Sequence, residues 1–218
     1  MSKVFIVGAT GKVGRRVGSQ LVARGHQVTA MHRSPEQGQE LRSLGALPVV
    51  GSLLELDTCG LSMLMAGSDV VLFSAGAGGA GMELTNAIDG RGLELSVEAA
   101  NIAGVKRFIL VSAFPEALRG GKISDGFENY IAVKKRSDIH LAETDLDWVI
   151  LRPGTLVDSP GTGKVRAGLA IPYGDVARDD VAATIVEIIE QPKINRVIIE
   201  LTQGDTPVGD AVRQLSRN

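Results

Sequence analysis

Tyr130 and Lys134 stand four residues apart in the stretch ENYIAVKKRSD, which we predict to be helical. Side chains at this spacing share one face of a helix, so the phenol and the ammonium group can point together into a crevice. A free phenol, with a pKa near ~10, is a poor acid–base catalyst at neutral pH, and a neighbouring cation favours its ionised form. A plainer alternative is that Lys134 forms an exposed ion pair with Asp138, worth about 0.3 to 0.5 kcal/mol, with Tyr130 half-buried at the edge.

A glycine-rich segment near the N-terminus, VGATGKVGRRVG, directly follows a short apolar run. Gly8, Gly11 and Gly14 are spaced three apart. Glycine at such positions permits a sharp turn from strand to helix, close approach of the backbone to a pyrophosphate, and tight packing of the helix. The unpaired N–H groups at the start of the helix then attract phosphate. The spacing is GxxGxxG rather than GxGxxG, but its place at the first strand-to-helix junction predicts nucleotide binding.

The competing phosphate-binding motif is a P-loop. Gly11-Lys12 and Gly163-Lys164 each resemble half of one. Gly8 is too close to Gly11, Val follows each Lys, and Asp158 stands where the first glycine should be. These departures argue against phosphoryl transfer.

The end of the second predicted strand, Met31-His32-Arg33-Ser34, bears on the choice of cofactor. An acidic residue here would bind the ribose 2′-hydroxyl of NAD, whereas a guanidinium can pair with the 2′-phosphate of NADP. We therefore predict NADP (NADPH), with NAD as the less favoured cofactor. Arg33 could instead be a solvated strand end, and Arg15 or Lys12 could assist it.

Short β-branched runs alternate with longer amphipathic segments along the chain. The runs are KVFIV, HQVTAM, ALPVV, DVVLFSA, RFILVSA, DWVILR and RVIIEL. The predicted helices are Val13–Arg24, Pro35–Leu44, Thr58–Ala66, Gly92–Ala103, Glu128–Thr144 and Asp179–Glu190. Uninterrupted apolar strands with helices between them predict an α/β protein with a doubly wound parallel sheet of about seven strands. We expect one domain over residues 1–218, a loop over Asp158–Val176, and a helix cap at Asp89.

The composition limits the classes of partner. Net charge is −2, hydrophobic residues make up 44%, and aromatic residues only 4%, so nucleic acid is not expected as a partner. No apolar stretch approaches the ~20 residues of a membrane span or resembles a secretion signal, so we expect a cytoplasmic protein that does not enter a membrane. One cysteine, Cys59, fits that compartment. No metal site is expected, because no paired spacing connects the three histidines, His26, His32 and His140.

Four segments together resemble one protein family. They are GATGKVG at 8–14, AGVKRFILVS at 103–112, YIAVK at 130–134 and LDWVILRPGTL at 146–156. In combination they resemble the atypical short-chain dehydrogenase/reductases, in particular the small NAD(P)-binding proteins related to biliverdin reductase B and the NmrA-like regulators. The resemblance runs from residue 3 to about residue 208. It implies a Rossmann fold with strand order 3-2-1-4-5-6-7 and a cofactor lying across the carboxyl edge of the sheet.

The resemblance also implies which residues contact the cofactor. The pyrophosphate loop would be Gly8, Ala9, Thr10, Gly11, Lys12, Val13 and Gly14. Arg33 would face the adenosine phosphate. The middle of the cofactor would be lined by Ser74, Ala75 and Gly76, and its nicotinamide end by Arg152, Pro153, Gly154 and Thr155. In the resembled enzymes the lysine holds the nicotinamide ribose and lowers the pKa of the tyrosine, which implies that Lys134 binds cofactor and that Tyr130 and Lys134 are catalytic.

Two departures from the family pattern stand out. Many relatives carry an Asp near the adenine after the glycine that ends the third strand, but this chain has Gly51-Ser52, so Ser52 takes that place. Larger relatives run two or three serines after the fifth strand, where this chain reads Ser112-Ala113-Phe114. Ser112 is therefore the candidate hydroxyl partner of Tyr130.

These features lead to a reductase as the first hypothesis: hydride passes from NADPH to a small carbonyl, quinone or flavin-like acceptor. A small lid within residues 155–178 would cover a small-molecule substrate, in a monomer or homodimer. The alternative is a non-catalytic NADP-binding redox sensor of the NmrA-like type. A structural subunit that uses the fold as a scaffold is a third possibility.

Overall fold

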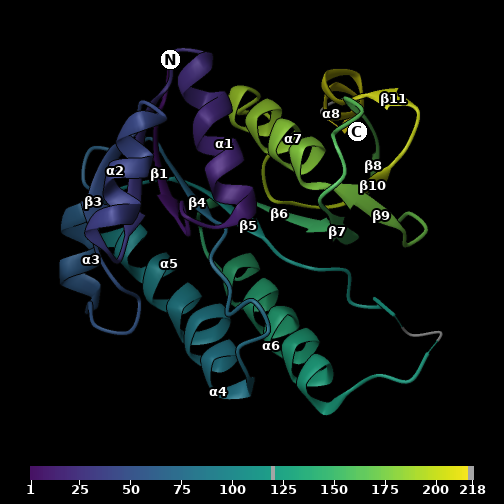
Figure 1. Cartoon of the computed structure of the whole chain (residues 1–218), viewed down its shortest axis with the longest axis horizontal. Coiled ribbons are helices and arrows are strands. Elements are labelled where there is room, and N and C mark those ends of the chain that lie inside the picture. Colours follow the sequence, from purple (N-terminus) through teal and green to yellow (C-terminus); the bar gives the residue numbers. More distant parts are fainter. Residues whose placement is uncertain (119–120, 216–218) are drawn as a thin grey trace.

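One nine-stranded sheet forms the centre of the computed structural model, which describes residues 1–118 and 121–215. Seven of its described strands run parallel, in the order β3-β2-β1-β4-β5-β6-β10 (Figure 1). They are β1 Lys3–Val7, β2 Gln27–His32, β3 Leu47–Val50, β4 Val70–Phe73, β5 Arg107–Val111, β6 Asp147–Pro153 and β10 Val197–Gln203. The predicted order 3-2-1-4-5-6-7 is confirmed with β10 as the seventh strand, and so is the doubly wound Rossmann fold.

The sheet has two strands more than we predicted. β8 (Lys164–Gly168) lies antiparallel to β10, and β11 (Thr206–Pro207) pairs with β8 at the edge. β7 (Thr155–Val157) and β9 (Asp175–Ala177) form a separate parallel pair. The expected loop over Asp158–Val176 is therefore wrong in part, because it contains β8. Only the valine of β8 is fully buried, so its sequence, KVRAG, needs no apolar run and gives no strand signal.

The parallel strands are apolar on both faces because helices cover both faces. β4 and β5 are buried along their whole length. The fully buried Phe5, Phe73 and Phe108 come from three adjacent strands and pack in the same core cluster.

Two layers of helices sandwich the sheet (Figure 1). One face carries α1 Lys12–Ala23, α2 Pro35–Ser43, α7 Arg178–Glu190 and α8 Val208–Leu215. The other carries α3 Thr58–Met65, α4 Met82–Leu84, the π-helical turn η1 Thr85–Arg91, α5 Gly92–Ile102 and α6 Asp125–Ala142. All six predicted helices are present within a few residues at each end.

Local hydrogen bonds define several helix starts. Ser34 and Gln37 form a capping box at α2, and the Asp57 carboxylate accepts the N–H of Gly60 at 2.7 Å at α3. Ser124 accepts the N–H of Phe127 at 3.3 Å, which starts α6 before the predicted Glu128. The expected helix cap at Asp89 is wrong, because this residue lies inside η1 and its side chain is buried.

Among the described residues, no helix is long and apolar enough to cross a membrane. Within the same part of the chain, no group of three or more His, Cys, Asp or Glu side chains is arranged to hold a metal ion.

Candidate cofactor and active site

The turn between β1 and α1 is packed so closely that it requires glycine. Gly8 has a φ of 86°, and a Cβ added there would lie 2.5 Å from the Ala75 nitrogen. A Cβ on Gly14 would lie 2.3 Å from the Gly8 carbonyl oxygen. The N–H of Gly11 donates to the same oxygen at 3.0 Å. The turn therefore fits tightly against the segment after β4. Gly11 is the N-cap of α1 and no side chain caps the helix, so its first N–H groups remain available to an anion.

Two of the residues expected in the pyrophosphate loop have buried side chains. The side chains of Ala9 and Val13 are buried in the core on the α1 side of the sheet. Thr10 and Gly11 line a cavity of about 350 Å³ at the carboxyl edge of the sheet. Lys12 does not line this cavity but lines a second one, which is described below.

The first cavity extends from the glycine turn to the ends of β2 and β3. It is lined by Arg33 and Ser52, and also by Met31, His32, Gln37, Gly51, Leu53, Leu54 and Ile88. Arg33 makes no ion pair with the described residues, whereas Arg15 is paired with Glu40. Among the described residues, Arg33 is the arginine that lines this cavity, and Arg15 does not line it.

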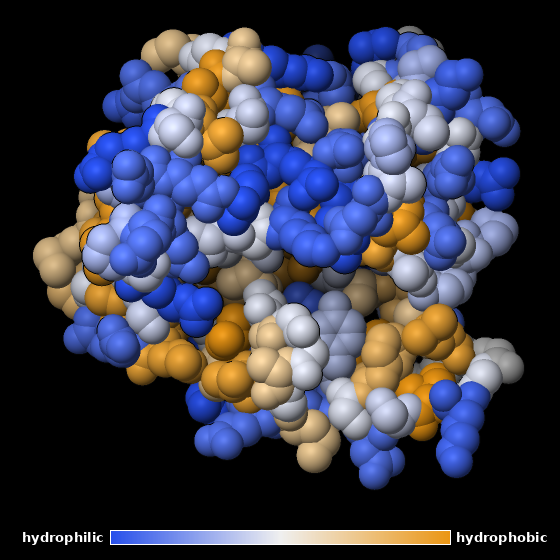
Figure 2. Space-filling model, in the orientation of Figure 1, coloured by the Kyte–Doolittle hydropathy of each residue, from blue (hydrophilic) through white to orange (hydrophobic). Residues whose placement is uncertain are grey.

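A second cavity, of about 690 Å³, continues from the first. The two share Gly11, Ser74, Ala75 and Gly76, so they form one crevice along the carboxyl edge. Figure 2 shows this face hollowed in the middle, with hydrophobic residues gathered below the hollow. Tyr130, Lys134 and Ser112 all line the second cavity, together with the apolar side chains of Phe127 and Leu156.

Lys134 is buried, with a relative exposure of 5%. Its Nζ lies 3.0 Å from Oδ1 of Asp89 and donates to the Val111 carbonyl at 3.2 Å. It lies 5.8 Å from the centroid of the Tyr130 ring. The alternative of an exposed pair with Asp138 is wrong, because Asp138 is only 3% exposed and binds Arg152.

The electrostatic state of Tyr130 differs from the expectation. Burial raises the pKa of Tyr130, Lys134 opposes that rise, and Asp89 and Asp138 add to it. Lys134 lowers the pKa of Tyr130 as expected, but its effect is smaller than that of burial, so this pKa stays above its ordinary value. Burial by itself would lower the pKa of Lys134, and the neighbouring Tyr130, Asp89 and Asp138 outweigh it, so that this pKa is raised.

Ser112 lies beside a carboxylate as well as in the cavity wall. It is 4% exposed, its Oγ makes no well-aligned hydrogen bond, and its hydroxyl lowers the pKa of Asp138. Arg152 donates from Nε to Oδ2 of Asp138 at 2.9 Å. The side chain of Arg152, which we expected at the nicotinamide end, is therefore directed at α6 and lines neither cavity.

The segment after β6 is closely packed against residues 173–174. A Cβ on Gly154 would lie 1.8 Å from the Gly174 carbonyl oxygen, and the hydroxyls of Thr155 and Tyr173 are 2.5 Å apart. Pro153, Gly154 and Thr155 are not among the residues that line the two cavities, whereas the next residue, Leu156, is.

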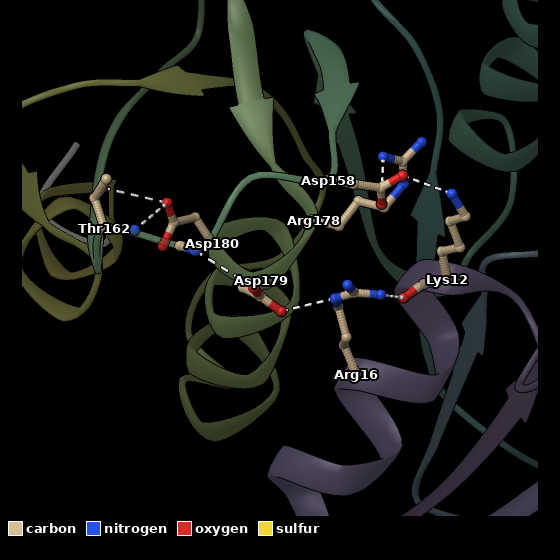
Figure 3. A network of polar contacts seen from close by, with 8 residues as sticks. Lys12, Arg16, Asp158, Thr162, Arg178, Asp179 and Asp180 are labelled. Carbon is tan, nitrogen blue, oxygen red and sulfur yellow. Dashed lines mark hydrogen bonds and ion pairs between the residues drawn. The ribbon is translucent and has the colours of Figure 1, made fainter.

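Ion pairs close the rim of the second cavity (Figure 3). Asp158 lies between two cations, with Oδ2 2.6 Å from Nζ of Lys12 and Oδ1 2.9 Å from Nη1 of Arg178. Both cations line the cavity. The Asp180 carboxylate accepts the N–H groups of residues 162 and 163 at 2.9 and 2.8 Å, which fixes the segment after Asp158 to the start of α7.

Sequence reasoning missed Asp89, Arg178 and Phe127 as residues of the site. Asp89 and Lys134 belong to different helices, and only the packing of η1 against α6 brings them together. Arg178 is the first residue of α7 and precedes the predicted start of that helix at Asp179. No short-range pattern identified any of the three.

Comparison with known proteins agrees with this geometry. A family model described as NAD(P)H-binding matches residues 8–192. The "Uncharacterized sugar epimerase YhfK" of Bacillus subtilis is 36% identical over 215 residues, which cover 98% of this chain and 100% of that protein. A solved structure from Bacillus halodurans, provisionally named an NAD-dependent epimerase/dehydratase, has a TM-score of 0.90 and 35% identity and covers 98% of this chain and 100% of its own. The oxidoreductase ylbE from Lactococcus lactis has a TM-score of 0.87 and 27% identity over 99% of this chain and 97% of its own.

Proposed function

Because this chain belongs to the NAD(P)H-binding family of atypical short-chain dehydrogenase/reductases, we propose that it transfers hydride from NADPH to a small carbonyl, quinone or flavin-like acceptor. The observation that carries the proposal is the continuous crevice. The glycine turn and Arg33, which makes no ion pair with the described residues, lie at one end of it, and Tyr130 and Lys134 lie in an apolar-walled cavity at the other.

Different residues along the crevice would bind different parts of the cofactor. The glycine turn would hold the pyrophosphate on backbone N–H groups, and Arg33 would pair with the 2′-phosphate. The nicotinamide supplies the hydride when the cofactor is bound. Lys134 would hold the nicotinamide ribose, and the phenol of Tyr130 would give a proton to the acceptor oxygen.

The walls of the second cavity support a small acceptor with apolar surface. Phe127 packs against Tyr130 with ring centroids 5.9 Å apart, and Leu156 lines the same cavity. We place a small lid within residues 155–178, where Tyr173 meets Phe114 edge-on at 5.4 Å. Water would be excluded from the acceptor by this set of aromatic and aliphatic side chains.

The first experiment is calorimetric titration with NADPH and NADH, followed by a screen of acceptors for NADPH oxidation. Fluorescence of Trp148 is a poor probe, because this residue lies near the start of β6, away from the carboxyl edge. We expect NADPH to bind about tenfold or more tightly than NADH, and turnover to fall by about 10² or more in Lys134→Met and in Tyr130→Phe. Lys135→Met is the matched control, because Lys135 neighbours Lys134 on α6 but lies 3.7 Å from Glu116 as an ion pair and does not line the cavity.

The outcomes separate three classes of protein. Continuous oxidation of NADPH by an acceptor supports a reductase. Binding of NADPH without turnover of any acceptor would favour the redox sensor, and isomerisation of a sugar without net consumption of cofactor would favour an epimerase, as the name of the Bacillus subtilis relative suggests. Absence of binding by either nucleotide would reject all three.

A further inference from the structure

Asp89 is a buried carboxylate that connects three parts of the second cavity. It is 1% exposed and lies in the π-helical turn η1. Its Oδ1 lies 3.0 Å from Nζ of Lys134, and its Oδ2 accepts the N–H of Ala77 at 2.9 Å. Its backbone carbonyl accepts the hydroxyl of Ser137 at 2.8 Å. The carboxylate thus ties the loop that follows β4 to the lysine of α6.

The π-helical turn explains how the carboxylate reaches both partners. A π-turn contains one residue more than an α-helical turn, which rotates a side chain by about 100° relative to the regular helix. Packing leaves little freedom at this point, since a Cβ on Gly76 would lie 3.0 Å from Oδ1 of Asp89. The loop from Ala75 onward therefore fits against the carboxylate as well as along the crevice.

The contacts of Lys134 limit what it can offer a ligand. A lysine has three N–H donors. One donates to the Val111 carbonyl, and the ammonium group also forms an ion pair with Asp89 at 3.0 Å. Lys134 therefore offers at most two N–H groups to a ligand in the cavity.

We propose that Asp89 is a positioning residue that fixes the ammonium group of Lys134 against β5 and couples it to the loop after β4. Its carboxylate also places a negative charge near the phenol of Tyr130, which favours the protonated form. Only the consequence for the bound nicotinamide ribose rests on the proposed function. The effect on the charge of Tyr130 is a property of the protein alone.

The other charged groups near Tyr130 have partners of their own. Asp138 on α6 is bound by Arg152 of β6, and Arg178 of α7 is bound by Asp158 at the rim. Lys12 of α1 shares Asp158 with Arg178. Asp89 is thus the carboxylate that balances Lys134, and it also adds to the raised pKa of Tyr130.

The phenol can be titrated directly, because the sequence contains two tyrosines. In a Tyr173→Phe background, Tyr130 is the sole tyrosine, and the absorbance of tyrosinate reports its ionisation. Absorbance would be read within seconds of a jump in pH, before alkaline unfolding. We expect Asp89→Asn to lower the midpoint by about one pH unit, because removal of a nearby negative charge favours the phenolate.

Two further variants make the result decisive. Asp57→Asn, which removes a carboxylate from the cap of α3, is the control and should leave the midpoint unchanged. Because a buried charge that loses its partner is destabilising, Asp89→Asn is also made together with Lys134→Met, and this double variant is compared with Lys134→Met alone. In that pair the midpoint should again fall when Asp89 is replaced.

A midpoint that stays constant or rises when Asp89 is replaced would overturn the proposal. As a second readout, Asp89→Asn should weaken NADPH binding about three- to tenfold, with retention of the fold checked by circular dichroism. If wild type binds no nucleotide, the proposed function fails while the titration of Tyr130 still decides the role of Asp89.

Discussion

The two ends of the crevice differ in whether main-chain groups or side chains form them. The end at the glycine turn is formed largely by main chain, with the N–H groups at the start of α1 and the side chain of Arg33, which makes no ion pair with the described residues. The end at Lys134 is formed by charged, buried side chains from η1 and α6, with the main chain of β5 beside them. The glycine turn is therefore encoded locally in the sequence, whereas the ion pair of Asp89 and Lys134 depends on long-range packing.

This difference predicts different kinds of sensitivity. At the glycine turn, an added side-chain atom should impair binding, because the backbone there is closely packed. At the Lys134 end, removal of a charged group should destabilise the fold, because its partner is left buried and unpaired. The four substitutions below test that contrast, from the largest expected free-energy effect to the smallest.

Arg152→Met should destabilise the fold by about 3 to 5 kcal/mol, because it leaves the buried Asp138 carboxylate without its partner. Burial, opposed by Ser112, Arg152 and Lys134, already raises the pKa of Asp138, so the native state holds this proton more tightly than the unfolded state. Stability from this group therefore falls as pH rises above its unfolded pKa, and the loss should be larger at about pH 8 than at about pH 5. Urea unfolding at both pH values measures it.

The double variant Arg152→Met with Asp138→Leu is the control for that measurement. Replacing both members of a buried pair with apolar side chains is often close to neutral, so the double variant should regain most of the lost stability. Equal destabilisation of the single and double variants would show that packing of the arginine, and not charge, is what matters.

Gly14→Ala should weaken NADPH and NADH equally, by about 10²-fold, or roughly 2.7 kcal/mol. The new Cβ would lie 2.3 Å from the Gly8 carbonyl oxygen, so the turn must open and its N–H groups must move. Gly18→Ala is the matched control on the same helix, since its Cβ would meet only Ile6 and Val28 at 3.8 and 3.9 Å. Calorimetry that found Gly14→Ala within threefold of wild type would refute the assignment of the pyrophosphate to this turn.

The same contrast explains what could be predicted from the sequence. The glycine turn and the parallel strands were predictable, because spacing within one turn and continuous apolar runs are local properties. β8 was missed because a short strand with one fully buried side chain resembles a loop in sequence. Asp89 was misread as a helix cap because Asp is common at helix starts, and only the packing of η1 on α6 shows its contact with Lys134.

Arg33→Ser sharpens the comparison at the glycine-turn end of the crevice, where we expect a single side chain to determine which cofactor binds more tightly. Loss of the guanidinium should weaken NADPH about tenfold, or about 1.4 kcal/mol, and leave NADH almost unchanged, because only NADPH carries the 2′-phosphate. Arg15→Ser is the control, since Arg15 is already paired with Glu40. If the two variants behave alike, the preference for NADP lies elsewhere.

Asp158→Asn should have the smallest effect and the opposite sign. Asp158 shares its carboxylate between Lys12 and Arg178 at the rim of the second cavity, so its removal frees two cations beside the start of α1. NADPH affinity should rise about two- to fivefold at low salt, and the gain should shrink at high salt because the side chains of Lys12 and Asp158 are more than half exposed. Asp179→Asn, which releases Arg16 on α1, is the control and should change affinity less, because Arg16 does not line the cavity. A loss of affinity in Asp158→Asn would instead mean that the carboxylate holds the two cations in their binding positions, in which case this rim resembles the charged end of the crevice and not the glycine end.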